Sequence, residues 1–338
     1  MTRSANPLHA NYNVAPVRKA FAKKTEKTPV AIEVLYDILK RPRFADSDGE
    51  AYVIEKYLLP LPNAWLDPCG NIWVQVGTGA TTMFACHTDT VHKMKAPNVE
   101  YALLYDNGML TQEGSTCLGA DCGTGIWIML NMIEAGVPGL YIFHREEESG
   151  RIGSEWIVEN MASALGGMGI KRCISFDRKG TKSIISHQSG ERCCSQAFID
   201  DLAAQLGTKK HEFEADDGGS YTDSYAYRGI IAECTNLSVG YYDQHSKGES
   251  QDVPFAAWLV NRLIQVDWES ISVEREPKLE EYGRFGWGGF SYDGYRSDVY
   301  GVSERELEDI RNAVTSNLDA VCELLLDQGF TPYEIESL

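Results

Sequence analysis

Short apolar runs along the chain alternate with longer amphipathic stretches, and turn residues separate them. Residues 28–41 predict a helix, because Thr28 is a good N-cap and Pro29 suits the first helical position. Residues 123–136 place apolar side chains on a wide helical face and predict another helix. Strands are predicted at 71–77, 83–86, 140–144, 173–177, 183–187 and 230–239. This alternation of strands and helices indicates an α/β sheet that is at least partly parallel.

The pattern changes towards the C-terminus. Residues 276–302 are rich in glycine, tyrosine and charge, which is typical of a linker or an extended surface loop. Ser303 then begins a capping box with Glu306, and apolar residues follow at spacings of three and four. We therefore expect a main domain over 1–275 and a small C-terminal helical segment over 303–338.

Composition narrows the classes of partner and location. The chain has 338 residues with 31 basic and 49 acidic side chains, a net charge of −18. Such a charge gives no general attraction to nucleic acid or to anionic membranes, and no stretch approaches the roughly 18 apolar residues of a membrane span. The nine cysteines lack regular spacing and no secretory signal is visible, so we expect a cytoplasmic protein with reduced thiols.

Histidine and acidic residues fall where the predicted strands end. The candidate metal ligands are His87, Asp121, Glu148, Asp177 and His245. Four of them lie at or just beyond the C-terminal end of a strand, where α/β sheets bind their ligands, and Asp121 opens a helix. Imidazole and carboxylate together suit zinc, with manganese or cobalt as substitutes. Taken singly, each has an ordinary structural explanation, since a lone histidine after a strand is usually structural and a Glu-Glu pair is usually solvated.

The order and context of these residues resemble the co-catalytic dizinc exopeptidases, the clan of zinc aminopeptidases, tripeptidases and carboxypeptidase-like metallopeptidases. His87-Thr88-Asp89-Thr90-Val91 is similar to their His-x-Asp-Thr-Val motif, and Gly119-Ala120-Asp121 to their Gly-Ala-Asp motif. Glu147-Glu148-Ser149-Gly150, continuing to Gly153-Ser154, is similar to Glu-Glu-x-Gly-x-x-Gly-Ser. Asp67-Pro68-Cys69-Gly70-Asn71 resembles the turn before their first metal strand. The resemblance covers about residues 30–265, and it matches Asp177 and His245 by order and context.

The resemblance implies a fold and a ligand set. The fold would be a three-layer α/β/α arrangement around a central mixed, mostly parallel sheet. His87 and Asp177 would bind one metal ion, Glu148 and His245 the other, and Asp121 would bridge the two. The cofactor would be two zinc ions, with manganese or cobalt able to replace them.

The resemblance also implies the catalytic residues. Glu147 would act as general base, taking a proton from a metal-bound water to leave a metal-bridging hydroxide, and later passing that proton to the leaving amine. Asp89 would orient the ring of His87 from behind the metal. The residue after the bridging aspartate is usually polar and is here Cys122. The peptide bond at that place is commonly cis in the clan, so we predict a cis bond between Asp121 and Cys122.

Two gaps in the sequence predict a catalytic domain without a lid. Only 68 positions separate Asp177 from His245, and only 34 separate His87 from Asp121. An oxyanion donor must then come from the same domain, and the candidates are Tyr241, Tyr242 and Tyr221. Asp223 resembles part of a Thr-Asp element near the active site of the clan and is expected to support it.

The sequence thus favours an aminopeptidase, with surplus carboxylates at the site to neutralise the free N-terminus of a peptide. An N-acyl-amino-acid amidohydrolase or a dipeptidase on the same scaffold stays open, and it would take an acylated amino acid or a short peptide. An inactive relative that serves as a binding module is the alternative of another class. The sequence also leaves a homo-oligomer open.

Overall fold

The computed structural model describes residues 30–92, 100–114 and 117–277. The predicted helical segment over 303–338 and nearly all of the predicted linker over 276–302 lie outside the described residues.

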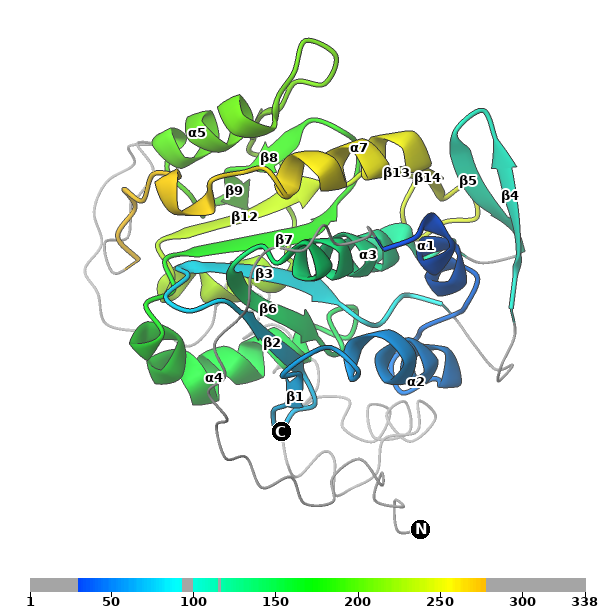
Figure 1. Cartoon of the computed structure of the whole chain (residues 1–338), viewed down its shortest axis with the longest axis horizontal. Helices are drawn as coiled ribbons and strands as arrows, with labels where there is room; N and C mark the ends of the chain where they lie inside the picture. The colour runs from blue at the N-terminus through cyan, green and yellow to red at the C-terminus, as the bar shows by residue number, and fades with distance from the viewer. Residues whose placement is uncertain (1–29, 93–99, 115–116, 278–338) are drawn as a thin grey trace, which may run out of the picture. The chain divides into compact units, whose positions relative to one another are not determined.

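Helices and strands alternate along the described chain (Figure 1). The helices are α1 (Ile32–Leu39), α2 (Asp48–Val53), α3 (Ala120–Ala135), α4 (Ile152–Gly167), α5 (Gln196–Leu206), α6 (Asp223–Ala226) and α7 (Val253–Leu263). A π-helical turn follows α2 (Ile54–Leu58), and short 3₁₀ turns lie at Tyr227–Gly229 and Trp268–Ser270. The strands of the main sheet are β1 (Trp65–Leu66), β2 (Ile72–Val76), β3 (Thr82–His87), β6 (Gly139–His144), β7 (Arg172–Arg178), β8 (Ser183–Ile185), β11 (Glu214–Asp216) and β12 (Glu233–Ser238). The shorter strands are β4 (Ala102–Asp106), β5 (Met109–Glu113), β9 (His187–Gln188), β10 (Glu191–Arg192), β13 (Tyr241–Tyr242) and β14 (Ser250–Asp252).

The main sheet has eight strands in the order β1-β2-β6-β3-β7-β12-β8-β11. Its centre is parallel, because β6, β3, β7 and β12 pair in one direction. The β1–β2, β2–β6 and β12–β8 pairs are antiparallel. The sheet is therefore mixed and mostly parallel at the strands that carry the candidate site, as predicted.

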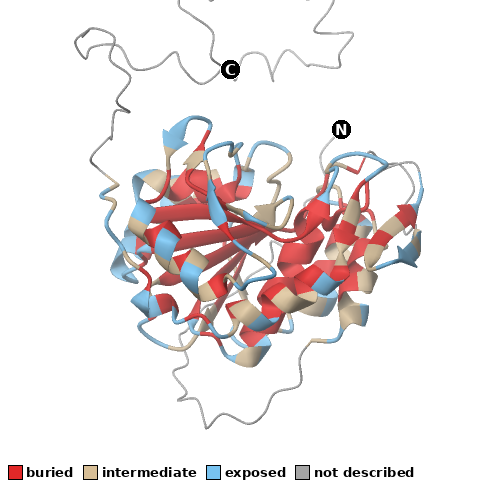
Figure 2. Cartoon of the chain, turned by 90° about the horizontal axis from the view of Figure 1, so that it is seen from above, coloured by how far each residue is buried: buried red, intermediate tan, exposed pale blue. Residues whose placement is uncertain are grey.

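Helices cover both faces of this sheet (Figure 1). Successive side chains of β3 alternate between two apolar cores: Phe84 and Cys86 pack with α1, α3, α5 and α7, whereas Met83 and Ala85 pack on the side of α4 and α6. Helix α3 is buried over most of its length, because it packs against β3, β7 and α7. Figure 2 shows buried residues throughout the central strands and exposed ones on the outer sides of the helices. The predicted three-layer α/β/α architecture is confirmed.

Several boundaries differ from the prediction. Helix α1 begins at Ile32 after Ala31, which makes no side-chain cap, and the predicted cap Thr28 lies outside the described residues. The predicted strand 230–239 is shorter, because a 3₁₀ turn ends at Gly229 and bends the chain before β12 begins. Helices α4, α5 and α7 were not predicted, although α5 and α7 each bury apolar residues at helical spacing.

The two gaps between ligands contain no separate lid domain among the described residues. Between β3 and α3 lies the β4–β5 hairpin, which joins β14 and β13 in a small four-stranded antiparallel sheet. Residues 178–245 form β8 to β13 with α5 and α6, which belong to the main fold or its covering helices. Among the described residues, no helix is both long enough and apolar enough to cross a membrane.

Candidate metal centre

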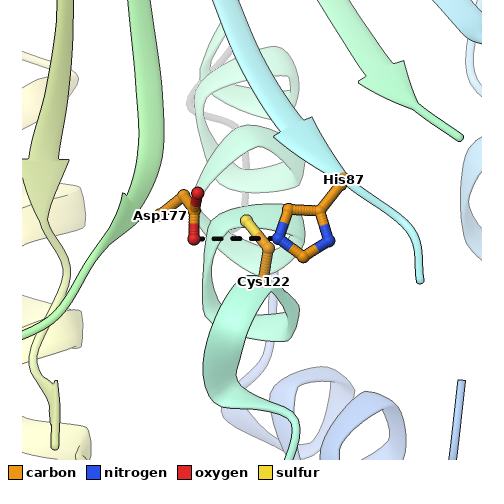
Figure 3. Close-up of side chains that lie close together, drawn as sticks. All are labelled: His87, Cys122 and Asp177. Atoms are coloured by element: carbon orange, nitrogen blue, oxygen red, sulfur yellow. Dashed lines mark ion pairs between the residues drawn. The ribbon is translucent and has the colours of Figure 1, made fainter. Parts of the chain in front are cut away.

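The candidate ligands meet at the C-terminal edge of the parallel strands. His87 is the last residue of β3 and lies opposite His144, the last residue of β6. Glu147 and Glu148 follow in the turn after β6, and Asp177 lies near the end of β7. Figure 3 shows the ring of His87 and the carboxylate of Asp177 facing each other from these neighbouring strands. The sheet thus brings together residues that are far apart in sequence.

The carboxylate of Asp121 lies between the two histidines. Its Oδ1 is 3.0 Å from Nε2 of His87, and its Oδ2 is 3.2 Å from Nε2 of His245. Each oxygen therefore faces a different imidazole. This is the arrangement that a bridging carboxylate adopts between two metal ions, with one oxygen turned towards each ion.

Each of the two histidines also faces a second carboxylate. Oδ1 of Asp177 lies 3.7 Å from Nε2 of His87, and Oε1 of Glu148 lies 3.1 Å from Nε2 of His245. Oε1 of Glu148 is buried and faces the ring of His245. Two ligands of one tetrahedral zinc ion are about 3.3 Å apart, so these separations fit donors that share an ion.

The donor set is one that a divalent metal ion can bind. Asp121, Glu148 and His245 can offer one atom each within 4.8 Å of one another, and so can His87, Glu147 and Glu148. Buried imidazoles and carboxylates without enough cations to match them are the chemistry that divalent metals satisfy. The five predicted ligands therefore converge at one place.

Cys122 lies next to this centre (Figure 3). Its Sγ lies 3.1 Å from the backbone carbonyl oxygen of Phe176 and donates a hydrogen bond to it. Burial raises the pKa of the thiol well above its ordinary value, which keeps the proton on sulfur. The peptide bond between Asp121 and Cys122 is cis, as predicted.

Asp89 contacts both halves of the site. Nδ1 of His87 lies 3.0 Å from the backbone carbonyl oxygen of Asp89 and 3.4 Å from its carboxylate. A proton on Nδ1 leaves Nε2 free to bind a metal ion. The carboxylate of Asp89 accepts hydrogen bonds from the backbone N–H groups of Glu147 at 3.0 Å and Glu148 at 3.2 Å. Asp89 therefore orients the His87 ring mainly through its carbonyl, and its carboxylate fixes the turn of the two glutamates.

Asp177 is held by three contacts that the motifs do not reveal. Thr222 donates a hydrogen bond to Oδ2 of Asp177 at 2.5 Å, and the backbone N–H of Asp177 donates to the side chain of Asn236 at 3.0 Å. The hydroxyl of Tyr241 donates to the backbone carbonyl of Asp177 at 2.9 Å. These groups leave Oδ1 of Asp177 directed at His87.

The loop before Asp121 is held by the buried side chain of Glu249, which was not among the predicted site residues. Glu249 accepts hydrogen bonds from the backbone N–H groups of Ala120 at 2.8 Å and of Gly119 and Asp121 at 3.3 Å. Arg43, which is fully buried, donates to the carbonyl of Gly119 at 2.7 Å. The sequence signal for this role is weak. Glu249 is an acidic residue four positions after His245, and it is far from Asp121 in sequence.

The predicted oxyanion donors occupy different places. Tyr241 is buried, and its hydroxyl already donates to Asp177. Tyr242 and Tyr221 are both exposed; Tyr221 lines the cleft at the metal centre, as Tyr241 does, and Tyr242 does not. Asp223 is buried and pairs with Nδ1 of His144 at 3.2 Å, so its contact is with the strand beneath the site.

The charges of the site are strongly coupled. Hydrogen bonds that the ring of His245 donates to the carboxylates of Asp121 and Glu148 raise the pKa of His245 to about 10. Burial and the neighbouring Asp121 raise the pKa of Asp177. Burial also raises the pKa of Glu147, although the charge of His87 opposes the shift. Such a concentration of perturbed groups in a cleft is typical of a functional site.

The ligands open onto a cleft of about 120 Å³. Its acidic lining consists, among the described residues, of Asp121, Glu147, Glu148 and Asp177. Two cationic residues, Arg178 and Lys179, also line it, together with Tyr221 and Gln244. The surplus carboxylates expected from the sequence are therefore not among the described residues of this lining.

The same fold occurs in solved peptidase structures. Aminopeptidase PepT from Bacillus cereus aligns over 69% of this chain and 96% of its own, with a TM-score of 0.52 and 14% identity. The TET1 peptidase of Pyrococcus horikoshii aligns over 69% and 98%, with a TM-score of 0.54 and 14% identity. A tripeptidase from Staphylococcus aureus aligns over 69% and 95%, with a TM-score of 0.51 and 12% identity. No protein-family profile and no curated protein sequence matches the chain. The chain thus has the fold of these peptidases, and the resemblance inferred from its motifs is confirmed at the level of fold.

Proposed function

We propose that this chain is a zinc-dependent exopeptidase, with aminopeptidase activity as its principal form. The observation that carries the proposal is the Asp121 carboxylate, which places one oxygen against His87 and the other against His245. Asp177 also faces His87, and Glu148 also faces His245. The fold of aminopeptidases and a tripeptidase supports the same reading.

In this proposal His87 and Asp177 hold one zinc ion, Glu148 and His245 hold the other, and Asp121 bridges them. When bound, the ions would lower the pKa of a water molecule and polarise the scissile carbonyl. The chain's own residues set the geometry, since Asp89 and Glu249 fix the two loops that carry ligands.

Glu147 is proposed as the general base. It lines the cleft, and its carboxylate can approach both His87 and Glu148 within 4.8 Å. One of its oxygens would accept the proton of the attacking water, and the same oxygen would return that proton to the leaving nitrogen. Tyr221 lines the same cleft and is the oxyanion candidate whose hydroxyl is not committed elsewhere among the described residues.

A second candidate function follows from the charges of the cleft. Arg178 and Lys179 line it, and no acidic residue beyond ligands and base is among its described lining. This favours a substrate with a carboxylate, which an N-acyl-amino-acid amidohydrolase or a dipeptidase would take. The two candidate functions would use the same metal centre and the same general base. They differ in the part of the substrate that binds beside the metal centre.

A panel of substrates separates the two candidates. Purified, zinc-loaded protein is tested on aminoacyl-anilides, on dipeptides and on N-acyl amino acids. Hydrolysis of the anilides supports the aminopeptidase. Activity confined to the acylated amino acids overturns it in favour of the amidohydrolase, and inactivity on every substrate after metal loading revives the binding-module alternative.

Assembly and location stay predictions. The TET1 peptidase of Pyrococcus horikoshii can assemble into a tetrahedron or a large octahedral shell, and this favours a test of homo-oligomers by light scattering. The eight described cysteines are all free thiols, in keeping with the predicted reducing cytoplasm.

A further inference from the structure

We infer that Lys179 binds a carboxylate group of the substrate, and that the enzyme acts on substrates carrying such a group beside the scissile bond. The inference rests on the proposed function, because it concerns the cleft above the metal centre. Its starting point is that Lys179 follows the ligand Asp177 by two positions and lines the same cleft.

The ammonium group of Lys179 is uncommitted. Among the described residues it has no ion pair and no hydrogen-bond partner, and the residue is exposed. Its neighbour Arg178 differs, because it donates a hydrogen bond to Oδ2 of Asp216 at 2.9 Å. Lys179 is therefore the cation of the cleft whose charge is not already offset.

The backbone around Lys179 is fixed, so its side chain starts from a defined place. The backbone carbonyls of Arg178 and Gly180 each accept a hydrogen bond at 2.8 Å from the backbone of residues 239–240. The carbonyl of Lys179 accepts one at 2.7 Å from the hydroxyl of Ser238. The N–H of Gly180 donates to the carbonyl of Tyr241 at 2.7 Å. Because the backbone is already ordered, only the side chain loses conformational entropy when it binds a ligand.

The charge balance of the loaded site favours an anion beside Lys179. Two divalent ions carry four positive charges, and four ionised carboxylates offset them: Asp121, Glu147, Glu148 and Asp177. Asp216 offsets Arg178. Lys179 therefore remains as the cation of the lining that has no carboxylate partner among the described residues, and a substrate carboxylate would supply one.

Two kinds of substrate carry a carboxylate at this place. One is a peptide with glutamate or aspartate at its N-terminus, whose side chain would reach the lysine. The other is a dipeptide, tripeptide or N-acyl amino acid, whose terminal carboxylate would do so. The chemistry at Lys179 is the same, so the two sources are separated by experiment.

The test compares charged and neutral substrates in pairs. Glutamyl-anilide against glutaminyl-anilide probes the side-chain source, and alanyl-alanine against its C-terminal amide probes the terminal source. We expect wild-type kcat/KM to favour the charged member of one pair by about 10- to 100-fold, mainly through KM. Lys179→Met should abolish that preference, so that kcat/KM on the charged member falls to about the value on the neutral member. Lys182→Met is the matched control, because Lys182 is exposed just before the next strand, β8, and does not line the cleft.

A binding measurement makes the outcome independent of turnover. Zinc-loaded Glu147→Gln protein, with and without Lys179→Met, is titrated calorimetrically with glutamyl-alaninamide, glutaminyl-alaninamide, alanyl-alanine and alanyl-alaninamide. A preference for a charged member that disappears with Lys179→Met supports the inference even if the wild type hydrolyses nothing, in which case the proposed function alone fails. Equal kcat/KM within both pairs overturns the inference and leaves the exopeptidase standing. Absence of both binding and hydrolysis overturns both.

Discussion

The carboxylate of Asp89 accepts a hydrogen bond at 3.0 Å from the backbone N–H of Glu147, the proposed general base. The same carboxylate accepts one at 3.2 Å from the N–H of the ligand Glu148. Because Glu147 and Glu148 are adjacent in sequence, the buried carboxylate of Asp89 fixes the backbone of both. Glu146, just before them, has a φ of 54°, an uncommon conformation that this anchoring helps to maintain.

Replacing Asp89 should therefore impair catalysis through position. In Asp89→Asn the amide group would face one of the two N–H donors, so the turn that carries Glu147 would shift. We expect kcat/KM to fall by about 10- to 100-fold, with weaker metal binding. Steady-state kinetics together with zinc titration measure both effects, and wild-type values for both would show that Asp89 is not a positioning residue.

The variant Glu147→Gln should keep its metal and lose its turnover. The amide preserves the size of the side chain but cannot accept the proton of the attacking water. We expect kcat to fall by about 10²- to 10⁴-fold with unchanged zinc content. Glu146→Gln is the matched control, because Glu146 neighbours the base but does not line the cleft. Loss of zinc in Glu147→Gln would mean that base and ligand have been assigned the wrong way round.

Glu249 should affect metal affinity, because it holds the loop that carries the proposed bridging ligand Asp121. Its carboxylate accepts three backbone N–H groups of the Gly119–Asp121 loop, and Glu249→Ala would leave these donors buried without acceptors. We expect zinc affinity to fall by about 10- to 100-fold. Competition with a chromogenic chelator measures the dissociation constants. A variant that folds with wild-type zinc affinity would contradict this role.

Glu50 should make stability depend on pH. Burial raises the pKa of its carboxyl to about 7, although Arg145 and the hydrogen bond from Thr88 oppose the shift. The folded protein then holds a proton that the unfolded chain releases above about pH 4.5. The contribution of this group is present below pH 4.5 and is lost as the pH rises to about 7.

Glu50→Gln tests this dependence, because its amide does not titrate. Urea unfolding at pH 5 and pH 7.5 should show a smaller loss of stability in the variant than in the wild type. The other titrating groups are common to both proteins and cancel in the comparison. The same loss in both proteins would rule out a raised pKa at Glu50.

The sequence anticipated the parts of the site that local backbone determines. His87 ends a buried strand, and Glu147 follows one, so strand signals and short motifs located them together. Asp177 and His245 required the order of ligands along the chain, because their surroundings carry no comparable motif. Topology then made them converge, since the central strands are parallel.

The supporting contacts could not be found in this way. Glu249, Arg43 and Thr222 act on backbone groups or side chains far away in sequence, and only the folded chain brings them there. The predicted role of the Asp89 carboxylate likewise depended on distances of a few tenths of an ångström. Helix α5, by contrast, carried a local signal that was not used, because Phe198, Ile199, Leu202 and Leu206 share one face and Ser195 is its N-cap.

The metal content of the purified protein tests the central claim most directly. The protein is loaded with zinc, unbound zinc is removed, and the bound zinc is measured by elemental mass spectrometry. We predict two zinc ions per chain. His245→Ala should retain about one, and Asp121→Ala should retain none with appreciable affinity, because Asp121 faces both histidines. A folded wild-type chain that binds no divalent metal, or whose zinc content is unchanged in Asp121→Ala, would contradict the account.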